Sequence, residues 1–264
     1  MKVKDNEKLG KILDDKRSGS SEILSGLNNF LLLNLNDRKL FNVSLFKANQ
    51  KLSHFAAISN YLKKLNALTK ISDYKNIKEF MNDFKRDEGI LYNRIFENVY
   101  RKLSSAKTIL TISRSGTVIK ILKLWFNRKR NLKIIITESR PANEGILTAK
   151  ELLKEGLKVE LITDAMAGLY LPKVDAAIIG ADAVLKNKNV INKAGSLSLA
   201  LLCKHHKKPL YVLAAKSKFV NKTRYKTEPE SSEKLWKYRH PNLKVTNIPF
   251  EEIDRKLITE IITD

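Results

Sequence analysis

Residues 133–145 read Lys-Ile-Ile-Ile-Thr-Glu-Ser-Arg-Pro-Ala-Asn-Glu-Gly, and this stretch decides the fold. Its first five residues form a continuous, β-branched apolar run, which is typical of a strand buried on both faces of a sheet. A segment with helical spacing follows over 143–154 and ends at Gly156, since glycine readily adopts the left-handed conformation that terminates helices. A buried strand that leads directly into a helix is the repeating unit of a parallel α/β sheet.

The same unit recurs on both sides of this stretch. Further strands are predicted by short apolar runs at 108–111, 159–162, 176–179 and 210–214, and helical spacing fills 118–126 and 195–206. Strands that alternate with helices at these intervals predict a Rossmann-like, doubly wound parallel sheet. Residues 222–249 are polar and predict irregular structure, whereas 253–262 is expected to form a last helix.

The part of the chain before residue 104 has a different pattern. Its apolar residues recur at spacings of three, four or seven, which predicts helices over 20–35, 42–68 and 73–103. No alternation of the kind that marks strands is sustained there. We therefore expect an α/β protein of two domains, a helical N-terminal domain over 1–103 and a Rossmann-like domain with a ligand pocket over 104–264.

Composition limits the class of protein. The chain has 264 residues and 50 Lys and Arg against 28 Asp and Glu, a net charge of +22. Such a field attracts RNA, phosphorylated ligands and acidic protein surfaces, although an ordinary solvated lysine-rich surface explains the charge equally well. There is no apolar run of the roughly 20 residues that a membrane span requires and no secretory signal. With one cysteine, Cys203, and four scattered histidines, we expect a cytoplasmic protein with no membrane segment, metal or other cofactor.

Polar side chains follow the predicted strands, where parallel sheets bind their ligands. The first strand leads into Ser113-Arg114-Ser115-Gly116-Thr117, and the free N–H groups at such a helix start attract anions. The second strand leads into Glu138-Ser139-Arg140-Pro141, where Arg140 can form a bidentate pair with phosphate or carboxylate.

The remaining strand ends add carboxylates and cations. Asp164 and Asp182 follow the third and fourth strands, Asn192 and Lys193 come ten residues after Asp182, and Lys218 follows the last strand. Each residue taken singly has a plainer interpretation as a helix cap, a turn or a partner of a structural lysine. Their repeated position at strand ends instead favours a site for a phosphorylated, polyhydroxylated small molecule. The predicted ligand-binding residues are Ser115, Gly116, Thr117, Arg140, Asn192, Lys193 and Lys218, with Glu138 and Asp164 in support. Neither a dinucleotide fingerprint nor a P-loop motif occurs.

Four motifs, in the order in which they occur along the chain, carry a family resemblance. They are T-E-S-R-P-A-N-E-G at 137–145, L-I-T-D-A at 161–165, V-D-A-A-I-I-G-A-D-A-V at 174–184 and I-N-K-A-G-S at 191–196. The region 104–219 resembles the superfamily of the alpha, beta and delta subunits of translation initiation factor 2B, which includes ribose-1,5-bisphosphate and methylthioribose-1-phosphate isomerases. Over the N-terminus the resemblance is weaker and rests on R-S-G-S-S-E at 17–22. It implies a helical domain on a Rossmann-like domain, with dimerisation through the latter.

The resemblance also implies roles for single residues. The isomerases use a cysteine after the first strand and the aspartate of G-A-D. That aspartate matches Asp182, whereas the cysteine position falls at Ser113. A serine hydroxyl is a poor nucleophile without an adjacent base, and the motif contains no histidine. The R-G-A-type substrate loop of the isomerases is not evident either.

These departures favour a non-catalytic member of the superfamily. We expect a homodimeric regulatory protein that binds a sugar phosphate or nucleotide and a translation partner such as an initiation factor subunit. The resemblance places the ligand contacts on Ser115, Arg140, Asn192, Lys193 and Lys218. Two alternatives stay open, namely an aldose–ketose isomerase with Asp182 as acid and base, and a basic RNA-binding protein.

Overall fold

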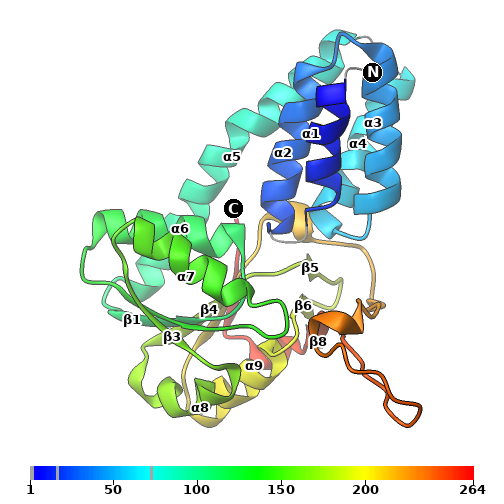
Figure 1. Ribbon diagram of the computed structural model, residues 1–264. Coiled ribbons are helices and arrows are strands. Elements are labelled where there is room, and N and C mark those ends of the chain that lie inside the picture. The colour runs from blue at the N-terminus through cyan, green and yellow to red at the C-terminus, as the bar shows by residue number, and fades with distance from the viewer. Residues whose placement is uncertain (1–2, 16–17, 72–73) are drawn as a thin grey trace.

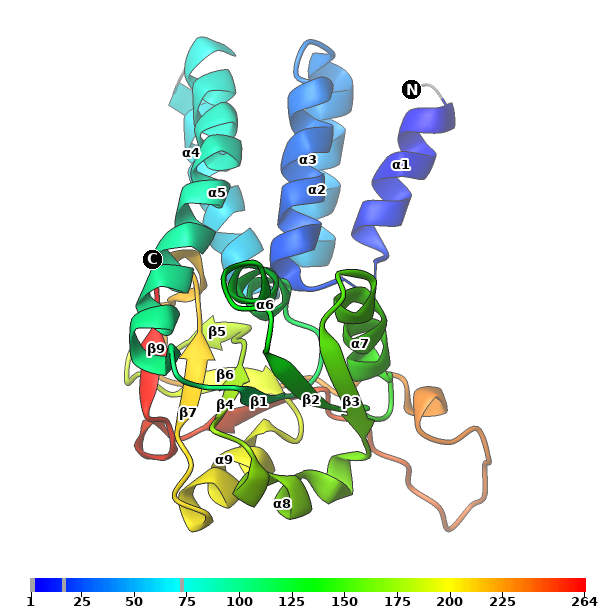
Figure 2. The same cartoon turned by 90° about the vertical axis from the view of Figure 1, so that its left-hand side faces the viewer.

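The N-terminal part of the chain is a bundle of helices. The computed structural model describes residues 3–15, 18–71 and 74–264, so Arg17 of the R-S-G-S-S-E motif lies outside the described residues. The bundle stands on the α/β part of the molecule (Figures 1 and 2). Its helices are α1 (Val3–Leu13), α2 (Ser20–Leu33), α3 (Arg38–Leu52), α4 (Ala56–Ile71) and α5 (Tyr74–Leu103).

The helix predicted over 42–68 is two helices, which corrects the sequence-based expectation. The chain turns at 53–55, where the backbone N–H of Phe55 donates to the carbonyl of Leu52. Apolar residues on both sides of the turn, among them Leu52 and Ile58, pack into one core of the bundle. Because the apolar spacing continues across the turn, the sequence pattern alone does not show the break.

A six-stranded sheet forms the centre of the second part. Its order is β3-β2-β1-β4-β7-β9 and every pair is parallel. The order reverses between β1 and β4, and such a switch point leaves a crevice at the carboxyl ends of the strands. The strands are β1 (Thr108–Thr111), β2 (Lys133–Thr137), β3 (Lys158–Ile162), β4 (Ala176–Ile179), β7 (Leu210–Leu213) and β9 (Glu260–Ile262).

Helices cover both faces of this sheet (Figure 2), as the predicted doubly wound fold requires. On one face lie α6 (Gly116–Arg128) and α7 (Glu144–Lys154), on the other α8 (Ala167–Tyr170) and α9 (Ser196–His205). Each face has its own apolar core, with Trp125 and Ile134 in the first and Leu199 and Val212 in the second. The fold class predicted from the sequence is thus confirmed, and the predicted boundary at 103/104 falls in the turn between α5 and β1.

The C-terminal segment departs from expectation, since the helix predicted over 253–262 is wrong. β8 (Phe250–Ile253) joins β5 (Ala183–Val184) and β6 (Val190–Lys193) in a small antiparallel sheet, and β9 extends the main sheet beside β7. A short apolar run lacks the periodicity that separates a strand from a helix. Main-chain pairing with neighbouring strands therefore determines the conformation of this segment. The predicted irregular tail at 222–249 is confirmed.

The remaining short helices are turns of 3-10 type, namely η1 (Asp164–Met166), η2 (Leu171–Lys173), η3 (Lys216–Lys218), η4 (Ser232–Lys234) and η5 (Arg255–Leu257). Within residues 3–15, 18–71 and 74–264, none of the helices combines the length and the apolar character that crossing a bilayer requires.

Candidate ligand cavity

A cavity of about 720 Å³ lies between the helical bundle and the carboxyl ends of the strands. Both parts of the molecule form its wall. The bundle contributes residues 18–21 at the start of α2 and 51–55 at the end of α3 and in the turn to α4. The α/β part contributes the loop after β1, the end of β6 and residues 224–231. The cavity therefore occupies the crevice that the switch point between β1 and β4 creates.

The approach of two strand ends shapes one side of the cavity. Ser115 caps α6, and its Oγ accepts a hydrogen bond of 3.4 Å from the backbone N–H of Val118. Gly180 follows β4, and a Cβ atom at this position would lie 2.3 Å from the Ser115 Oγ. Only a glycine permits this approach, so Gly180 keeps the N-terminus of α6 open to the cavity beside the end of β4.

Three charged residues at strand ends meet in this cavity. Asp182 follows β4, Lys193 ends β6, and Lys218 lies in η3 after β7. Burial raises the pKa of the Asp182 carboxyl, and the charges of Lys218 and Lys193 act in the opposite direction. Burial lowers the pKa of the Lys218 amine, opposed by the charge of Asp182. Because these groups are withdrawn from water, their interactions with a bound anion or hydroxyl are stronger than on a surface.

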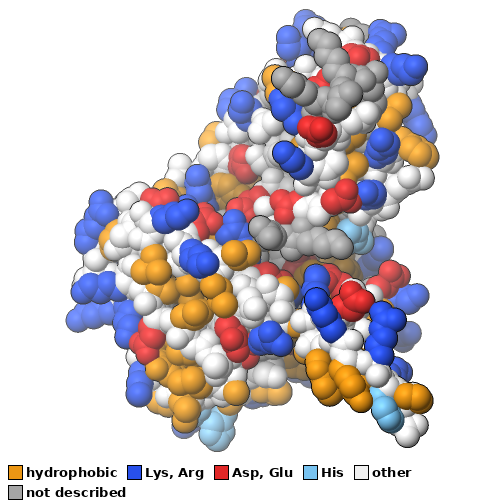
Figure 3. Space-filling model, in the orientation of Figure 1, with side chains coloured by type: hydrophobic (Ala, Val, Ile, Leu, Met, Phe, Trp, Pro, Cys, Tyr) orange, Lys and Arg blue, Asp and Glu red, His pale blue; other side chains and the backbone are white. Residues whose placement is uncertain are grey.

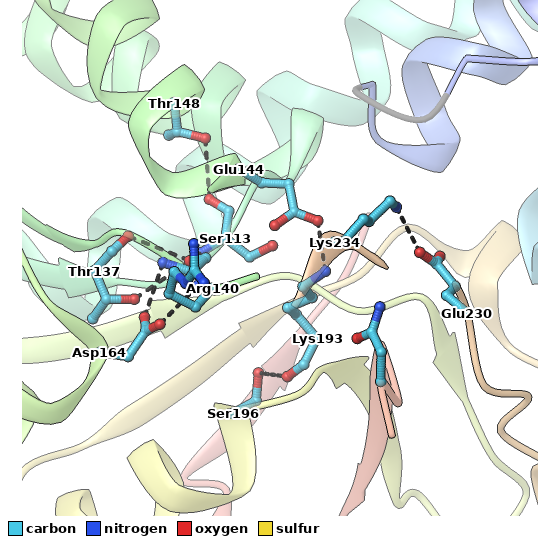
Figure 4. A network of polar contacts seen from close by, with 12 residues as sticks. Ser113, Thr137, Arg140, Glu144, Thr148, Asp164, Lys193, Ser196, Glu230 and Lys234 are labelled. Carbon is cyan, nitrogen blue, oxygen red and sulfur yellow. Dashed lines mark hydrogen bonds and ion pairs between the residues drawn. The ribbon is translucent and has the colours of Figure 1, made fainter. Parts of the chain in front are cut away.

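A carboxylate from α7 already holds one of these cations. The Nζ of Lys193 donates to the Oε1 of Glu144 over 2.5 Å, and the side chains are only 10% and 16% exposed. Figure 4 shows the two pointing toward each other, with the pair of Lys234 and Glu230 nearby. No sequence pattern marks Glu144 as a cavity residue, although it lines the wall. Its position means that an anionic ligand competes with Glu144 for Lys193.

The structure brings together seven of the residues singled out in the sequence. Ser113, Ser115, Gly116, Asp182, Asn192, Lys193 and Lys218 all line the cavity. The side chain of Asn192 is held in place, because its Nδ2 donates to the Oγ of Ser196 over 2.9 Å. Its amide oxygen is the atom left for a ligand.

Four other predicted residues do not line the cavity, which corrects the expectation that all of them converge. They are Thr117, Glu138, Arg140 and Asp164. Thr117 is buried in the first turn of α6. The backbone N–H of Glu138 donates to the carbonyl of Ile162, so the chain is still paired with β3 there.

Arg140 lies beside Asp164 and apart from the pair of Lys193 and Glu144 (Figure 4). The Asp164 carboxylate accepts from the backbone N–H of Ser139 over 2.9 Å and from that of Arg140 over 2.8 Å. These bonds hold the Arg140 backbone at the junction of β2 and β3, away from the switch point between β1 and β4. Asp164 thus supports the turn after β2, and the exposed side chain of Arg140 is directed elsewhere than the cavity.

Two further residues could not have been found from local patterns. His54 reaches the cavity from the turn between α3 and α4, and burial lowers its pKa. Arg114 connects the two parts of the molecule, because its guanidinium donates to Glu22 of α2 over 2.8 Å and to Glu151 of α7 over 2.7 Å. Among the described residues, no cluster of three or more His, Cys, Asp or Glu side chains could hold a metal ion.

Comparison with known proteins assigns this chain to a family. The sequence profile of the Initiation factor 2 subunit family matches residues 7–264. The chain belongs to this family. Similar curated members include a putative translation initiation factor eIF-2B subunit 2-like protein of Pyrococcus furiosus, 41% identical over 61% of this chain and 58% of the relative. Another is the ribose 1,5-bisphosphate isomerase of Methanocaldococcus jannaschii, 31% identical over 62% of this chain and 55% of the relative.

A solved structure of the family has the same fold. The translation initiation factor eIF-2B of Pyrococcus horikoshii OT3 superimposes with a TM-score of 0.83 and 24% identity, covering 100% of this chain and 96% of that one. The family thus contains proteins named as initiation factors and proteins named as sugar-phosphate isomerases, so membership alone does not assign an activity to this chain.

The single cysteine of this family member lies outside the cavity wall. Cys203 is buried in the core between α9 and the sheet. Burial raises the pKa of its thiol from 9.0 to about 12. The thiolate, which is the reactive species, is therefore scarce in the folded protein at neutral pH.

We expect alkylation of Cys203 by iodoacetamide at pH 8 to be at least about 1000-fold slower in the folded protein than in urea, because three pKa units lower the thiolate fraction by that factor. Between pH 9.5 and 11 the rate in the folded protein should still rise with pH, whereas the rate in urea levels off. Mass spectrometry of quenched samples measures both rates. Equal rates with and without urea would contradict the burial of this thiol.

Proposed function

We propose that this chain is a regulatory, non-catalytic member of the family that binds a sugar phosphate or a nucleotide in the cavity between its two parts. One observation carries the proposal. The cavity presents cations and hydroxyl-binding groups at the strand ends, but its wall carries Ser113 where the resemblance implies a catalytic cysteine, and the only cysteine of the chain lies in the core. Recognition of the ligand is thus supported and thiol chemistry is not.

The chemistry of the wall suits a phosphorylated, hydroxylated ligand. The N-terminus of α6 at Ser115 and Gly116 offers backbone N–H groups and the positive end of the helix dipole to a phosphate. Lys193 and Lys218 add positive charge, and Asp182 can accept hydrogen bonds from sugar hydroxyls. A volume of about 720 Å³ is ample for a molecule of this size.

We further propose that the chain acts as a homodimer and binds a translation partner. The names of its initiation-factor relatives support the partner class, although the P. furiosus relative is matched over only 58% of its own length. Affinity capture from native lysate should recover an initiation factor subunit, and light scattering should give twice the mass of the chain. Capture that recovers no translation component counts against this role.

The cavity assignment predicts different effects for two cations. Lys193→Ala should weaken binding of ribose 1,5-bisphosphate or adenosine monophosphate about 10- to 150-fold, the range for a lost charge-assisted hydrogen bond. Arg140→Ala should leave the affinity within about twofold, because Arg140 does not line the cavity. Isothermal titration calorimetry on both variants and the parent chain measures this. A larger loss for Arg140→Ala than for Lys193→Ala would show that the ligand binds elsewhere.

A second function, aldose–ketose isomerisation, is favoured by one specific observation. Asp182 faces the cavity with a raised pKa, which suits a group that must both accept and donate a proton. Incubation with ribose 1,5-bisphosphate, followed by NMR, separates the two functions. We expect binding without conversion. Conversion that Asp182→Asn abolishes would establish the isomerase instead.

A further inference from the structure

The irregular segment after η4 carries aromatic rings at alternate positions. Residues 234–240 read Lys-Leu-Trp-Lys-Tyr-Arg-His, and we call Trp236, Tyr238 and His240 the aromatic ladder. The segment projects from the body of the molecule (Figure 1). Trp236 is 56% exposed and Tyr238 55% exposed. Large aromatic rings usually contribute to cores, so a group of exposed ones indicates a surface that binds something.

The rings of the aromatic ladder are stacked on one another. The ring centroids of Trp236 and Tyr238 are 5.1 Å apart at 30°, and those of Tyr238 and His240 are 6.4 Å apart at 12°. The backbone at 236–240 is neither helix nor strand of a sheet, and an extended chain places alternate side chains on the same side. The ladder thus presents a stack of rings at the surface, with Trp236 and Tyr238 each more than half exposed.

Positive charge surrounds these rings. From residue 234 to residue 249 the chain has four basic side chains and no acidic one, and two of them, Lys237 and Arg239, alternate with the rings along the sequence. Figure 3 shows basic and hydrophobic side chains together on this projecting segment. Arg239 pairs with Glu233 over 3.1 Å at the surface, but exposed ion pairs are weak and a phosphate is a stronger partner for a guanidinium.

We propose that the aromatic ladder binds single-stranded nucleic acid. Bases stack on the outward faces at the two ends of the ladder, at Trp236 and His240, and Lys237 and Arg239 contact the phosphates. Stacked rings with interleaved cations are the combination that single strands recognise, since every base has a face to stack and every nucleotide carries a charge. A duplex hides its base faces, and an acidic protein would match the cations but leave the rings unused. This function is separate from the ligand cavity, which Trp236, Tyr238 and His240 do not line.

The two tryptophans of the chain make a direct test possible. Trp125 is 0% exposed, so a nucleic acid that quenches tryptophan fluorescence does so at Trp236. Titration with a 12-nucleotide oligouridylate and with an oligothymidylate of equal length should quench this fluorescence. Anisotropy of the same oligonucleotides with a fluorescein label gives the affinity independently.

Variants separate stacking from charge. Trp236→Ala should weaken binding about 5- to 100-fold, as expected for the loss of one stacked base. Tyr238→Ala should also weaken binding, because it removes the ring that holds Trp236 and His240 in one stack. Trp236→Phe should bind within about threefold of the parent chain while the quenching disappears. The neighbouring Leu235→Ala, exposed but not aromatic, serves as the matched control and should bind normally. Lys237→Gln should lower the slope of log affinity against log salt by about one.

Several results would overturn the proposal. They are binding without quenching, unchanged affinity in Trp236→Ala together with Tyr238→Ala, loss of binding in Leu235→Ala, and equal competition by duplex RNA or inorganic polyphosphate. Absence of binding at low salt would also refute it. Equal affinity for the two oligonucleotides would support stacking alone, and a preference for the oligouridylate would support stacking together with recognition of the 2′-hydroxyl.

Discussion

Gly145→Ala is expected to lower the free energy of unfolding by about 3 kcal/mol or more. A Cβ atom at Gly145 would lie 1.8 Å from the carbonyl oxygen of Thr137, the last residue of β2. This neighbour is backbone and cannot rotate away as a side chain would. To accept one methyl group, α7 must move away from the strand that precedes it, against a packed core.

Gly89→Ala is the matched control for this variant. Gly89 lies in α5, where an added Cβ would meet nothing within 4 Å, so the change should stabilise the chain by about 0.5–1 kcal/mol. Urea unfolding followed by circular dichroism measures both. Equal stability of the two variants would show that α7 does not pack as closely on β2 as described here.

The sequence predicts much of the α/β part because local and tertiary preferences agree there. The β-branched run that forms β2 is long enough and apolar enough to be a strand in any arrangement. The segment at 253–262 is different, since β8 and β9 form by pairing with β6 and β7, which lie far away in the sequence. A pattern read along the chain contains no information on that pairing.

The candidate site also contains some residues that the sequence predicts and others that it does not. The position of Asp182 and Lys218 at the cavity follows from the sequence, because the carboxyl ends of parallel strands meet at one edge of a sheet. Lys193 lines the cavity from β6 of the antiparallel sheet instead. The same rule failed for Arg140, because which strand ends border the crevice depends on the strand order, and β2 is not at the switch point. His54 comes from the helical bundle, and no local rule predicts which loop of a bundle faces a neighbouring sheet.

Substitutions that break the pair of Glu144 and Lys193 are expected to cause a similarly large loss of stability. Removing one partner leaves the other charge buried without compensation, so Lys193→Met should cost about 3–5 kcal/mol of stability, and Glu144→Gln about 2–4 kcal/mol. The double variant removes both charges and should be much closer to the parent chain. A double-mutant cycle from urea unfolding should therefore give a coupling of at least about 2 kcal/mol, and additive losses would mean that the pair does not form.

Phosphate should distinguish the two single variants. In Glu144→Gln, Lys193 has lost its competing carboxylate and needs an anion, so inorganic phosphate should stabilise this variant more than it stabilises the parent chain. At ten times its Kd, the gain is about 1.4 kcal/mol. Lys193→Met keeps the carboxylate and loses the cation, and the same phosphate should leave its stability unchanged. An equal response of both variants would indicate that phosphate binds away from Lys193. The two variants are expected to differ because Lys193 both stabilises the fold and binds the ligand. Its ammonium group pairs with Glu144 until a bound anion replaces that carboxylate.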